Sequence, residues 1–221
     1  MAAKKKTEPK KTTAKKAARK PATPKVARDP AAPKVARKSA ALKVPTTKTA
    51  APHSEGAWAA VFAPRAAGEK RYWLVKSEPT TFSFDDLLRL PNRTTHWDGV
   101  RNFVARNFMR DGMRAGDRVF FYHSSTDPQA IVGICDVARE GYPDHTALDR
   151  QHAHFDPDSD PAAPRWFQVD LKAVAQFTHP VTLTSLKDRA ELKQMAMLRI
   201  GRLSVTPVTA REWQVICDMA G

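Results

Sequence analysis

Runs rich in aromatic and β-branched residues recur between residues 71 and 208, and such residues suit the pleated, half-buried surface of a sheet. Pro79 closes the first run, because proline cannot donate to a ladder of strand hydrogen bonds. A hairpin through Ser124–Pro128 joins the second and third runs, and Gly133 marks a bulge or a close approach. The runs predict strands or extended segments at Arg71–Lys76, Arg118–His123, Gln129–Val137, Arg165–Phe177 and Arg202–Val208.

Helical patterns lie between and after these runs. Helices are predicted at Phe84–Leu90, Thr184–Ala190, Glu191–Leu198 and after Thr209. The last helix begins at Thr209, since Glu212 three residues later completes a capping box. The inward side chains of that helix are predicted to be Trp213, Ile216 and Cys217. Residues 140–164 have the composition of a loop, and the whole pattern predicts a small α+β domain on a curled sheet or barrel.

The central stretch His96–Arg110 mixes aromatic, amide and guanidinium side chains. The spacing of its apolar residues suits one buried helix face, made of Val100, Phe103, Val104 and Phe108. Asp98 is predicted to cap this helix. Gly99 would then let a backbone or a ligand come close. We interpret the stretch as the wall of a pocket for a flat, polar molecule, presenting Trp97, Arg101, Asn102 and Arg106.

The positive charge is concentrated at the beginning of the chain. Of the formal net charge of +14, residues 1–57 contribute +13, from 16 basic and 3 acidic residues. This Lys/Ala/Pro-rich segment holds no aromatic residue, so it cannot bury enough apolar surface to offset the entropy of ordering. We therefore expect a disordered basic tail at 1–57 and a linker or docked segment at 58–70. One domain follows at 71–221. The tail would bind phosphate backbones without reading sequence, although any polyanion or an acidic membrane surface would also attract it.

The remaining composition indicates a reducing compartment. Cys135 and Cys217 lie in apolar segments without a CxxC motif, which favours two buried thiols over a disulfide framework or a metal site. No stretch is long and apolar enough to span a membrane, and the N-terminus lacks the apolar core of a secretory signal. We expect a cytoplasmic protein, associated with the nucleoid in a bacterium or nuclear in a eukaryote, and favour a monomer.

Six blocks in order resemble the EVE domain family over about residues 71–219. They are Tyr72–Pro79, Trp97–Asn102, Ala105–Asn107, Phe121–Ser124, Arg165–Trp166 and Arg202–Val208. The resemblance implies a PUA-like fold, a curled mixed β-barrel with flanking helices. That superfamily includes domains that bind RNA and a domain that binds methylated DNA. The resemblance therefore implies a reader of a modified base in DNA or RNA. Thr206 departs from the pattern, since many members carry Gln there.

The resemblance, together with the polar residues at predicted strand ends, indicates a set of site residues. The base pocket is predicted to contain Ser77, Glu78, Trp97, Asn102, Tyr122, His123, Ser124 and Ser204. Contacts to phosphate are predicted for Lys76, Arg101, Arg106 and Arg202. Each has a plainer interpretation that stays open: a turn for Lys76–Glu78, a core ring for Trp97, a local cap for Asn102 and strand alternation for Ser204.

Catalytic alternatives have weaker support in the sequence. His123 and Ser124 are neighbours in a strand and should point to opposite faces, and no nucleophile elbow or phosphate-binding glycine loop is present. The group His145, His152, His154 and Asp156 fits no standard zinc spacing. We expect a non-enzymatic binding module without cofactor or metal. One alternative is a hydrolase acting on a modified base or nucleotide in the same pocket, as in some PUA-like relatives. Another is a nucleoid protein that acts through its tail.

Overall fold

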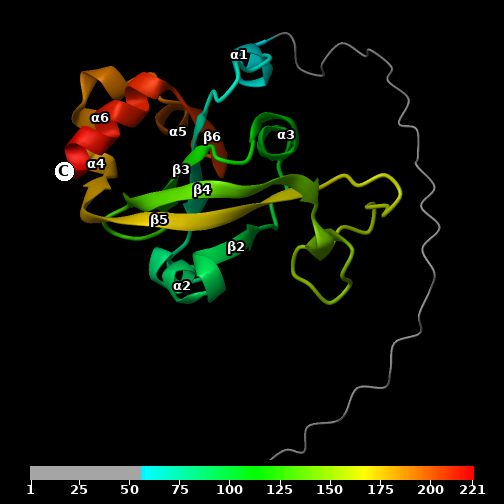
Figure 1. The fold of residues 1–221 in the computed structure, drawn as a ribbon. Helices are drawn as coiled ribbons and strands as arrows, with labels where there is room; N and C mark the ends of the chain where they lie inside the picture. The colour runs from blue at the N-terminus through cyan, green and yellow to red at the C-terminus, as the bar shows by residue number, and fades with distance from the viewer. Residues whose placement is uncertain (1–55) are drawn as a thin grey trace, which may run out of the picture. The chain divides into compact units, whose positions relative to one another are not determined.

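The computed structural model describes residues 56–221, which contain a six-stranded mixed sheet with helices on both faces (Figure 1). The predicted basic tail lies outside the described residues except for its last two positions. The strands are β1 (Tyr72–Ser77), β2 (Thr94–Trp97), β3 (Arg118–His123), β4 (Ala130–Pro143), β5 (Phe167–Thr182) and β6 (Val205–Val208). Their order is β2-β5-β4-β3-β1-β6, and only β1 and β3 run parallel among these strand pairs.

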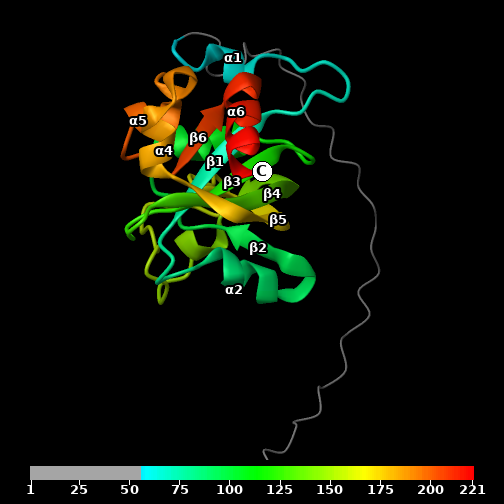
Figure 2. The same ribbon diagram turned by 90° about the vertical axis from the view of Figure 1, so that its left-hand side faces the viewer.

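Helices and helical turns cover the two faces of this sheet. They are α1 (Ala59–Phe62), α2 (Phe84–Arg89), α3 (Phe103–Asn107), α4 (Leu183–Asp188), α5 (Ala196–Arg199) and α6 (Ala210–Ala220). Short 3-10 turns occupy Pro91–Arg93, His145–Ala147 and Ala190–Leu192, and a π-helical turn occupies Phe108–Gly112. Figure 2 shows α4, α5 and α6 gathered on the side of the sheet away from α2.

Each face of the sheet holds its own apolar core, because successive side chains of a strand point to opposite faces. Trp73 and Val75 of β1 belong to the core that also contains residues of α2 and α3. Leu74, which lies between them, belongs to the core beneath α4, α5 and α6. The predicted α+β class with flanking helices is confirmed, and the sheet is open, with β2 and β6 at its edges.

Several local predictions are confirmed. The Thr209 side chain accepts from the Glu212 amide, and the Glu212 side chain accepts from the Thr209 amide, which is the predicted capping box. Gly133 sits where the β4–β5 register shifts. A Cβ at Gly133 would lie 2.5 Å from the Phe84 ring, so the predicted close approach is also present. Cys135 is a buried free thiol as predicted, whereas the free thiol of Cys217 is only half-buried.

The central stretch differs from its prediction. Residues expected to precede the helix form β2, and α3 begins at Phe103 with Asn102 as its N-cap. The prediction that Asp98 caps the helix is therefore wrong. The single buried face is wrong as well, because Phe103 and Val104 are 49% and 39% exposed. Val100 lies before the helix, so its spacing to Phe103 and Val104 does not define a helix face.

Two strands are longer than predicted. β4 continues to Pro143, into the segment expected to be a loop, and β5 continues to Thr182. Pairing between these strands extends the ladder, since Tyr142 lies opposite Gln168 and Ala130 opposite Thr182. Within residues 56–221, every helix is too short or too polar to cross a bilayer.

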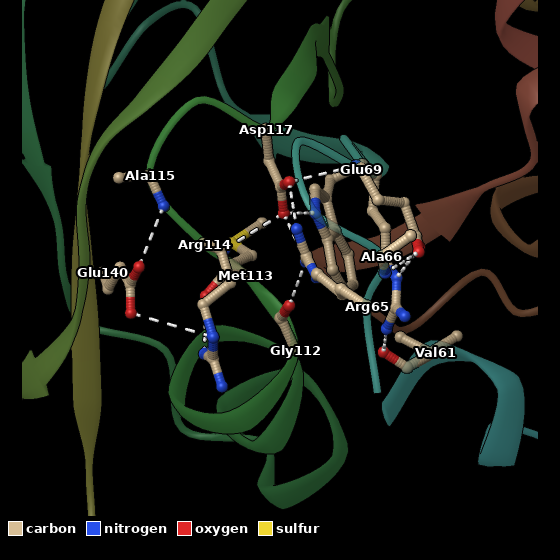
Figure 3. A network of polar contacts seen from close by, with 12 residues as sticks. Val61, Arg65, Ala66, Glu69, Gly112, Met113, Arg114, Ala115, Asp117 and Glu140 are labelled. Carbon is tan, nitrogen blue, oxygen red and sulfur yellow. Dashed lines mark hydrogen bonds and ion pairs between the residues drawn. The ribbon is translucent and has the colours of Figure 1, made fainter. Parts of the chain in front are cut away.

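The segment before β1 is held on the domain by the buried carboxylate of Asp117 (Figure 3). The Arg65 guanidinium donates to both Asp117 oxygens, and the Trp73 indole donates to one of them at 2.8 Å. Backbone amides of Arg71 and Arg114 also donate to Asp117, each at 3.0 Å. Burial by itself would raise the pKa of Asp117, but these hydrogen bonds hold it below its usual value, so the carboxylate stays ionised.

Candidate functional site

Two cavities adjoin at the end of β1. The cavity beside β2, called here the Trp97 cavity, has a volume of about 470 Å³. The cavity beside β3, called the Tyr122 cavity, has a volume of about 520 Å³. Lys76, Glu78 and Ser204 line both, so the two cavities share a wall. This is the region where the sequence predicts a binding site.

Most of the predicted residues line one of these cavities. The Trp97 cavity is lined by predicted residues Lys76, Ser77, Glu78, Trp97, Arg101 and Ser204. The Tyr122 cavity is lined by predicted residues Lys76, Glu78, Tyr122, Ser124, Arg202 and Ser204. Asn102, His123 and Arg106 line neither cavity.

Strand pairing brings these residues together. Parallel strands end at the same edge of a sheet, and β1 and β3 pair so that Ser77 lies opposite His123. The Ser124 amide then donates to the Ser77 carbonyl at 2.8 Å. On the other side of β1, the Lys76 amide donates to the Ser204 carbonyl at 2.8 Å. Three segments distant in sequence therefore meet at the end of β1.

Lys76 lies at the wall shared by the two cavities. Its ammonium donates to the Gly201 carbonyl at 3.1 Å. Burial lowers the pKa of Lys76 below its ordinary value, because a charged ammonium loses hydration there. Glu78 is exposed beside it and accepts from the Ser125 hydroxyl at 2.9 Å. A cation and a carboxylate thus border the same opening, which suits a ligand with both acceptors and donors.

Three hydroxyl groups of the site already have partners within the protein. Ser77 donates to the Phe82 carbonyl at 2.5 Å, and Ser124 donates to the Ser77 carbonyl at 3.1 Å. The Tyr122 hydroxyl donates to the Gln129 side chain at 2.7 Å, and burial raises the pKa of Tyr122 to about 12. These bonds fix the shape of the cavities, and each hydroxyl oxygen keeps acceptor capacity for a ligand.

Trp97 forms a wall of its cavity from within the core. It ends β2 opposite Val169 of β5, and its ring packs edge-on against Phe121 with centroids 5.5 Å apart. The side chain is 9% exposed. Trp97 therefore presents a narrow apolar surface to the cavity while most of the ring supports the sheet.

The loop after Trp97 is shaped by His154, which the sequence presents only as a member of a metal group with non-standard spacing. Gly99 has a φ of +71°, and a Cβ there would lie 2.4 Å from Nδ1 of His154. The positive φ favours glycine here, and a side chain would also have to displace the exposed His154 ring. Asp98 lines the same cavity, and burial together with the nearby charge of Asp144 raises its pKa.

Arg101 joins this loop to the segment that follows β4. Its guanidinium donates to the buried Asp144 carboxylate at 2.7 Å, to the Thr146 hydroxyl at 3.2 Å and to the His154 carbonyl. Burial by itself would raise the pKa of Asp144, but its bonds from Arg101, Thr146 and the Gly99 amide lower it. Arg101 thus lines the Trp97 cavity while it orders the cavity's outer wall.

The predicted residues that lie outside both cavities make structural contacts. Asn102 caps α3, since its side-chain oxygen accepts from the amides of Val104 and Ala105. The His123 ring accepts from the Phe84 amide at 3.1 Å, at the start of α2. Arg106 donates to the Arg165 carbonyl at 2.6 Å.

The arrangement differs from that of a hydrolytic pair. His123 Nε2 is used by the Phe84 amide, whereas the Ser124 hydroxyl donates to the Ser77 carbonyl. The two side chains therefore have separate partners, as expected for neighbours in a strand. Across residues 56–221, no group of three or more His, Cys, Asp and Glu side chains is placed to hold a metal ion.

The cavities contain further residues that sequence reasoning missed. Phe82 and His154 line the Trp97 cavity, and Lys187 lines the Tyr122 cavity. Phe82 could have been predicted from the sequence, because it closely follows the Ser77–Pro79 turn. His154 and Lys187 carry no comparable local signal, since long-range contacts bring them to the site.

A larger cavity of about 530 Å³ lies elsewhere, between α1 and the start of α6. Its lining is mostly apolar and includes Trp58, Trp73 and Pro207, but none of the predicted site residues. Size alone does not indicate a base site, which needs hydrogen-bonding groups at the edge of the ligand. Glu69, Arg71 and Gln194 border this cavity too, but the two cavities at the end of β1 hold most of the predicted site residues.

The chain is similar to proteins of one family along most of its length. The EVE domain model matches residues 71–219. Thymocyte nuclear protein 1 of Danio rerio is 38% identical over 164 residues, which cover 66% of this chain and 71% of that protein. A hypothetical protein from Leishmania major has a solved structure that is 46% identical, with a TM-score of 0.66 over 70% of this chain and 97% of its own.

A second solved structure adds a bound partner. The human THYN1 protein was crystallised in complex with DNA containing 5-methylcytosine. It is 36% identical, with a TM-score of 0.66, and the match covers 68% of this chain and 98% of the human chain. The family resemblance and the PUA-like fold expected from the sequence are confirmed by these matches.

Proposed function

Because this chain belongs to the EVE domain family, we propose that it is a non-enzymatic module that binds DNA and recognises a modified base. The base enters the Trp97 cavity, and a basic tail adds affinity for the phosphate backbone. The observation that carries the proposal is the Trp97 cavity itself, which joins an apolar wall to groups able to bind the edge of a base. Pockets for small flat ligands have this combination.

The DNA bound by the human relative suggests 5-methylcytosine as the first base to test. Cytosine presents an amino donor beside ring and carbonyl acceptors, so it needs an acceptor and a donor from the protein. Glu78 supplies a carboxylate, and Lys76 supplies an ammonium at the shared wall. The apolar surfaces of Phe82, Trp97 and Val100 suit a methyl group.

A base inside a duplex has to leave the stack before it can enter such a cavity. Extrusion costs a few kcal/mol, and the cost is least for a single strand or a mismatched base. The proposal therefore implies tighter binding to a modified base in a single strand or bubble than in a closed duplex. The binding test also decides between DNA and RNA that carry the same base.

The Tyr122 cavity is proposed to hold the backbone beside the base. Lys76, Lys187 and Arg202 line it, and Arg202 is exposed. Phosphate contacts position a protein on a strand without reading its sequence. Residues 1–57 add a charge of +13 for the same purpose. The division into a tail at 1–57, a docked segment at 58–70 and a domain at 71–221 belongs to this proposal. So does residence in the nucleus of a eukaryote or at the nucleoid of a bacterium.

Filling the Trp97 cavity tests the proposal. Thr81 is exposed and lines the cavity, whereas its neighbour Thr80 is exposed and lies outside the lining. We expect Thr81→Trp to lower affinity for a 5-methylcytosine oligonucleotide by about tenfold or more, as measured by fluorescence anisotropy. Thr80→Trp is the matched control and should bind as the unmodified protein does.

Three results would contradict the proposal. One is equal affinity for methylated and unmethylated strands. A second is equal weakening by Thr80→Trp and Thr81→Trp, which would locate the base elsewhere. The third is release of a new base, nucleoside or nucleotide during incubation, followed by mass spectrometry, which would favour the hydrolase alternative.

A further inference from the structure

An aromatic pair with one exposed ring lies beside the Trp97 cavity. Phe103, the first residue of α3, is 49% exposed and stacks on Trp166 with ring centroids 4.8 Å apart and planes 17° from parallel. Trp166 is buried by comparison. A single exposed apolar side chain is ordinary in a folded protein, so the groups that surround Phe103 decide whether it has a role.

Three guanidinium groups surround this aromatic pair. Arg106 lies over the Phe103 ring, with its central carbon 5.0 Å from the centroid, and Arg165 lies 5.9 Å from the same centroid. Arg101 lies 5.3 Å from the Trp166 ring. Guanidinium groups beside aromatic faces are a usual feature of surfaces that bind single-stranded nucleic acid.

The pair is held in place by hydrogen bonds to its surroundings. The Trp166 indole donates to Asp156 at 2.5 Å. Arg106 donates to the Arg165 carbonyl and to the Asn107 side-chain oxygen, both neutral acceptors that leave its positive charge in place. Burial lowers the pKa of Arg106, but a guanidinium keeps its charge at neutral pH in proteins. A fixed ring and a charged group beside it form a preorganised surface.

This surface is continuous with the proposed base site. A groove of about 370 Å³ is lined by Phe103, Trp166 and Arg165, and it shares Arg101 and His154 with the Trp97 cavity. A nucleic-acid strand with one base bound in the Trp97 cavity would therefore pass Arg101 and His154 and reach Phe103. Asp156 and Asp158 also line the groove, but both pair with Arg165. Their charges disfavour phosphate near Arg165 and favour a neutral ring in the groove.

We propose that Phe103 and Trp166 form a stacking platform for the base that neighbours the recognised base, and that Arg106 contacts the phosphate near it. This inference rests on the proposed function, because it takes the Trp97 cavity as the site of the recognised base. A platform of this kind binds any base through its ring face and reads no hydrogen-bonding edge. It raises affinity for a locally unstacked strand and adds little preference for one neighbouring base over another.

The test compares Phe103→Ala with Val104→Ala in the full-length chain. Both residues are exposed on the first turn of α3, but Val104 does not line the groove. The probes are 5-methylcytosine oligonucleotides whose two neighbouring positions carry either bases or abasic sites. We expect Phe103→Ala to weaken binding about fivefold or more on the fully based strand, the lower end of what one stacked base contributes. The loss should vanish on the abasic strand, and Val104→Ala should bind as the unmodified protein does.

A second readout follows stacking directly. The fluorescent base 2-aminopurine, placed next to 5-methylcytosine, should be quenched on binding, and Phe103→Ala should abolish that quenching while Val104→Ala preserves it. A Phe103→Ala loss that is the same on based and abasic strands would overturn the platform. Quenching that is unchanged in Phe103→Ala would also overturn the platform. Preference for the methylated strand should survive Phe103→Ala, and if the unmodified protein has no such preference, the proposed function fails independently of the platform.

Discussion

Arg65 and Asp117 form a two-pronged ion pair across 52 residues of the chain, with nitrogen–oxygen distances of 2.5 and 2.7 Å. The Asp117 side chain is 1% exposed, and Arg65 comes from the segment that precedes the first strand. The same Arg65 guanidinium donates to the Gly112 carbonyl at 2.5 Å (Figure 3). These bonds therefore tie the segment before β1 to Asp117 and Gly112, although the family match begins only at residue 71.

Loss of Arg65 should destabilise the fold. Arg65→Ala removes two charge-assisted bonds to a buried carboxylate, which keeps donors from Trp73, Arg71 and Arg114. We expect the free energy of unfolding to fall by about 2–4 kcal/mol in urea denaturation. Arg89→Ala is the control, because the Arg89–Asp86 pair is exposed and should contribute less than about 1 kcal/mol. Equal effects of the two variants would mean that the Asp117 network adds no more than a surface pair.

His123 should make stability depend on pH below neutrality. Burial lowers the pKa of His123, although Asp85 opposes the shift, and the ring accepts the Phe84 amide only when it is neutral there. The unfolded chain then binds a proton more readily than the folded one, so stability is complete above about pH 6.5 and is lost as pH falls through the folded pKa.

The His123 effect is measured as a difference between proteins. Melting temperatures of the unmodified chain and of His123→Gln should be compared from pH 7.5 to pH 5. Glutamine has an amide oxygen that can accept from Phe84 but no group that titrates in this range. We expect the unmodified chain to lose more stability than His123→Gln on acidification. Parallel curves would show that His123 does not contribute.

Local sequence patterns predicted those strands that can be recognised without knowing their pairing partners. The aromatic and β-branched composition of β1 and β3 is visible without knowledge of their partners, and the capping box at Thr209 and Glu212 involves neighbours in sequence. β2 is different, because Thr94–Trp97 becomes a strand by pairing with β5, where Thr94 lies opposite Lys172. The later start of the central helix is set by Asn102, whose side chain accepts from the first-turn amides of Val104 and Ala105.

The site was predictable only as far as strand ends determine it. Ser77 and Ser204 lie at ends of extended segments, and strand pairing brings those ends together. The position of His154 depends on Arg101, which donates to the Asp144 carboxylate and to the His154 carbonyl. These contacts join segments far apart in the sequence, so no local pattern encodes them. Asn102 shows the opposite case: its possible role as a helix cap was visible in sequence, and the structure uses it in that way.

The basic tail should account for most of the salt dependence of DNA binding. Residues 1–57 carry +13 of the +14 net charge, and each neutralised phosphate contributes about −0.9 to the slope of log affinity against log salt for duplex DNA. Deleting 1–57 should flatten that slope and leave preference for a modified base intact. The deletion ends before Trp58, whose ring packs on Phe108 at 5.3 Å.

A control for the tail keeps its length and removes its charge. A chain in which the lysines of residues 1–57 are replaced by glutamine should behave as the deletion does in anisotropy titrations across a salt series. If the glutamine chain keeps the original slope, charge is not the cause. If the deletion abolishes preference for the modified base, the tail takes part in recognition and the division of roles proposed for this chain is wrong.

Trp97 should affect stability and base binding together, because the ring belongs to the core as well as to the cavity wall. It is 9% exposed and packs edge-on against Phe121. If Trp97 only lined a pocket, Trp97→Ala would cost less than truncation of a core tryptophan. The observed burial leads us to expect the full loss of about 3–5 kcal/mol in the free energy of unfolding. Trp97→Phe keeps much of the packing and should cost less.

Binding to 5-methylcytosine strands should be measured on Trp97→Phe by anisotropy, with folding checked by circular dichroism at the same temperature. A stable Trp97→Phe chain with weakened affinity for the methylated strand and unchanged affinity for unmethylated DNA would support the wall role. A Trp97→Ala chain as stable as the unmodified protein would contradict the burial argument.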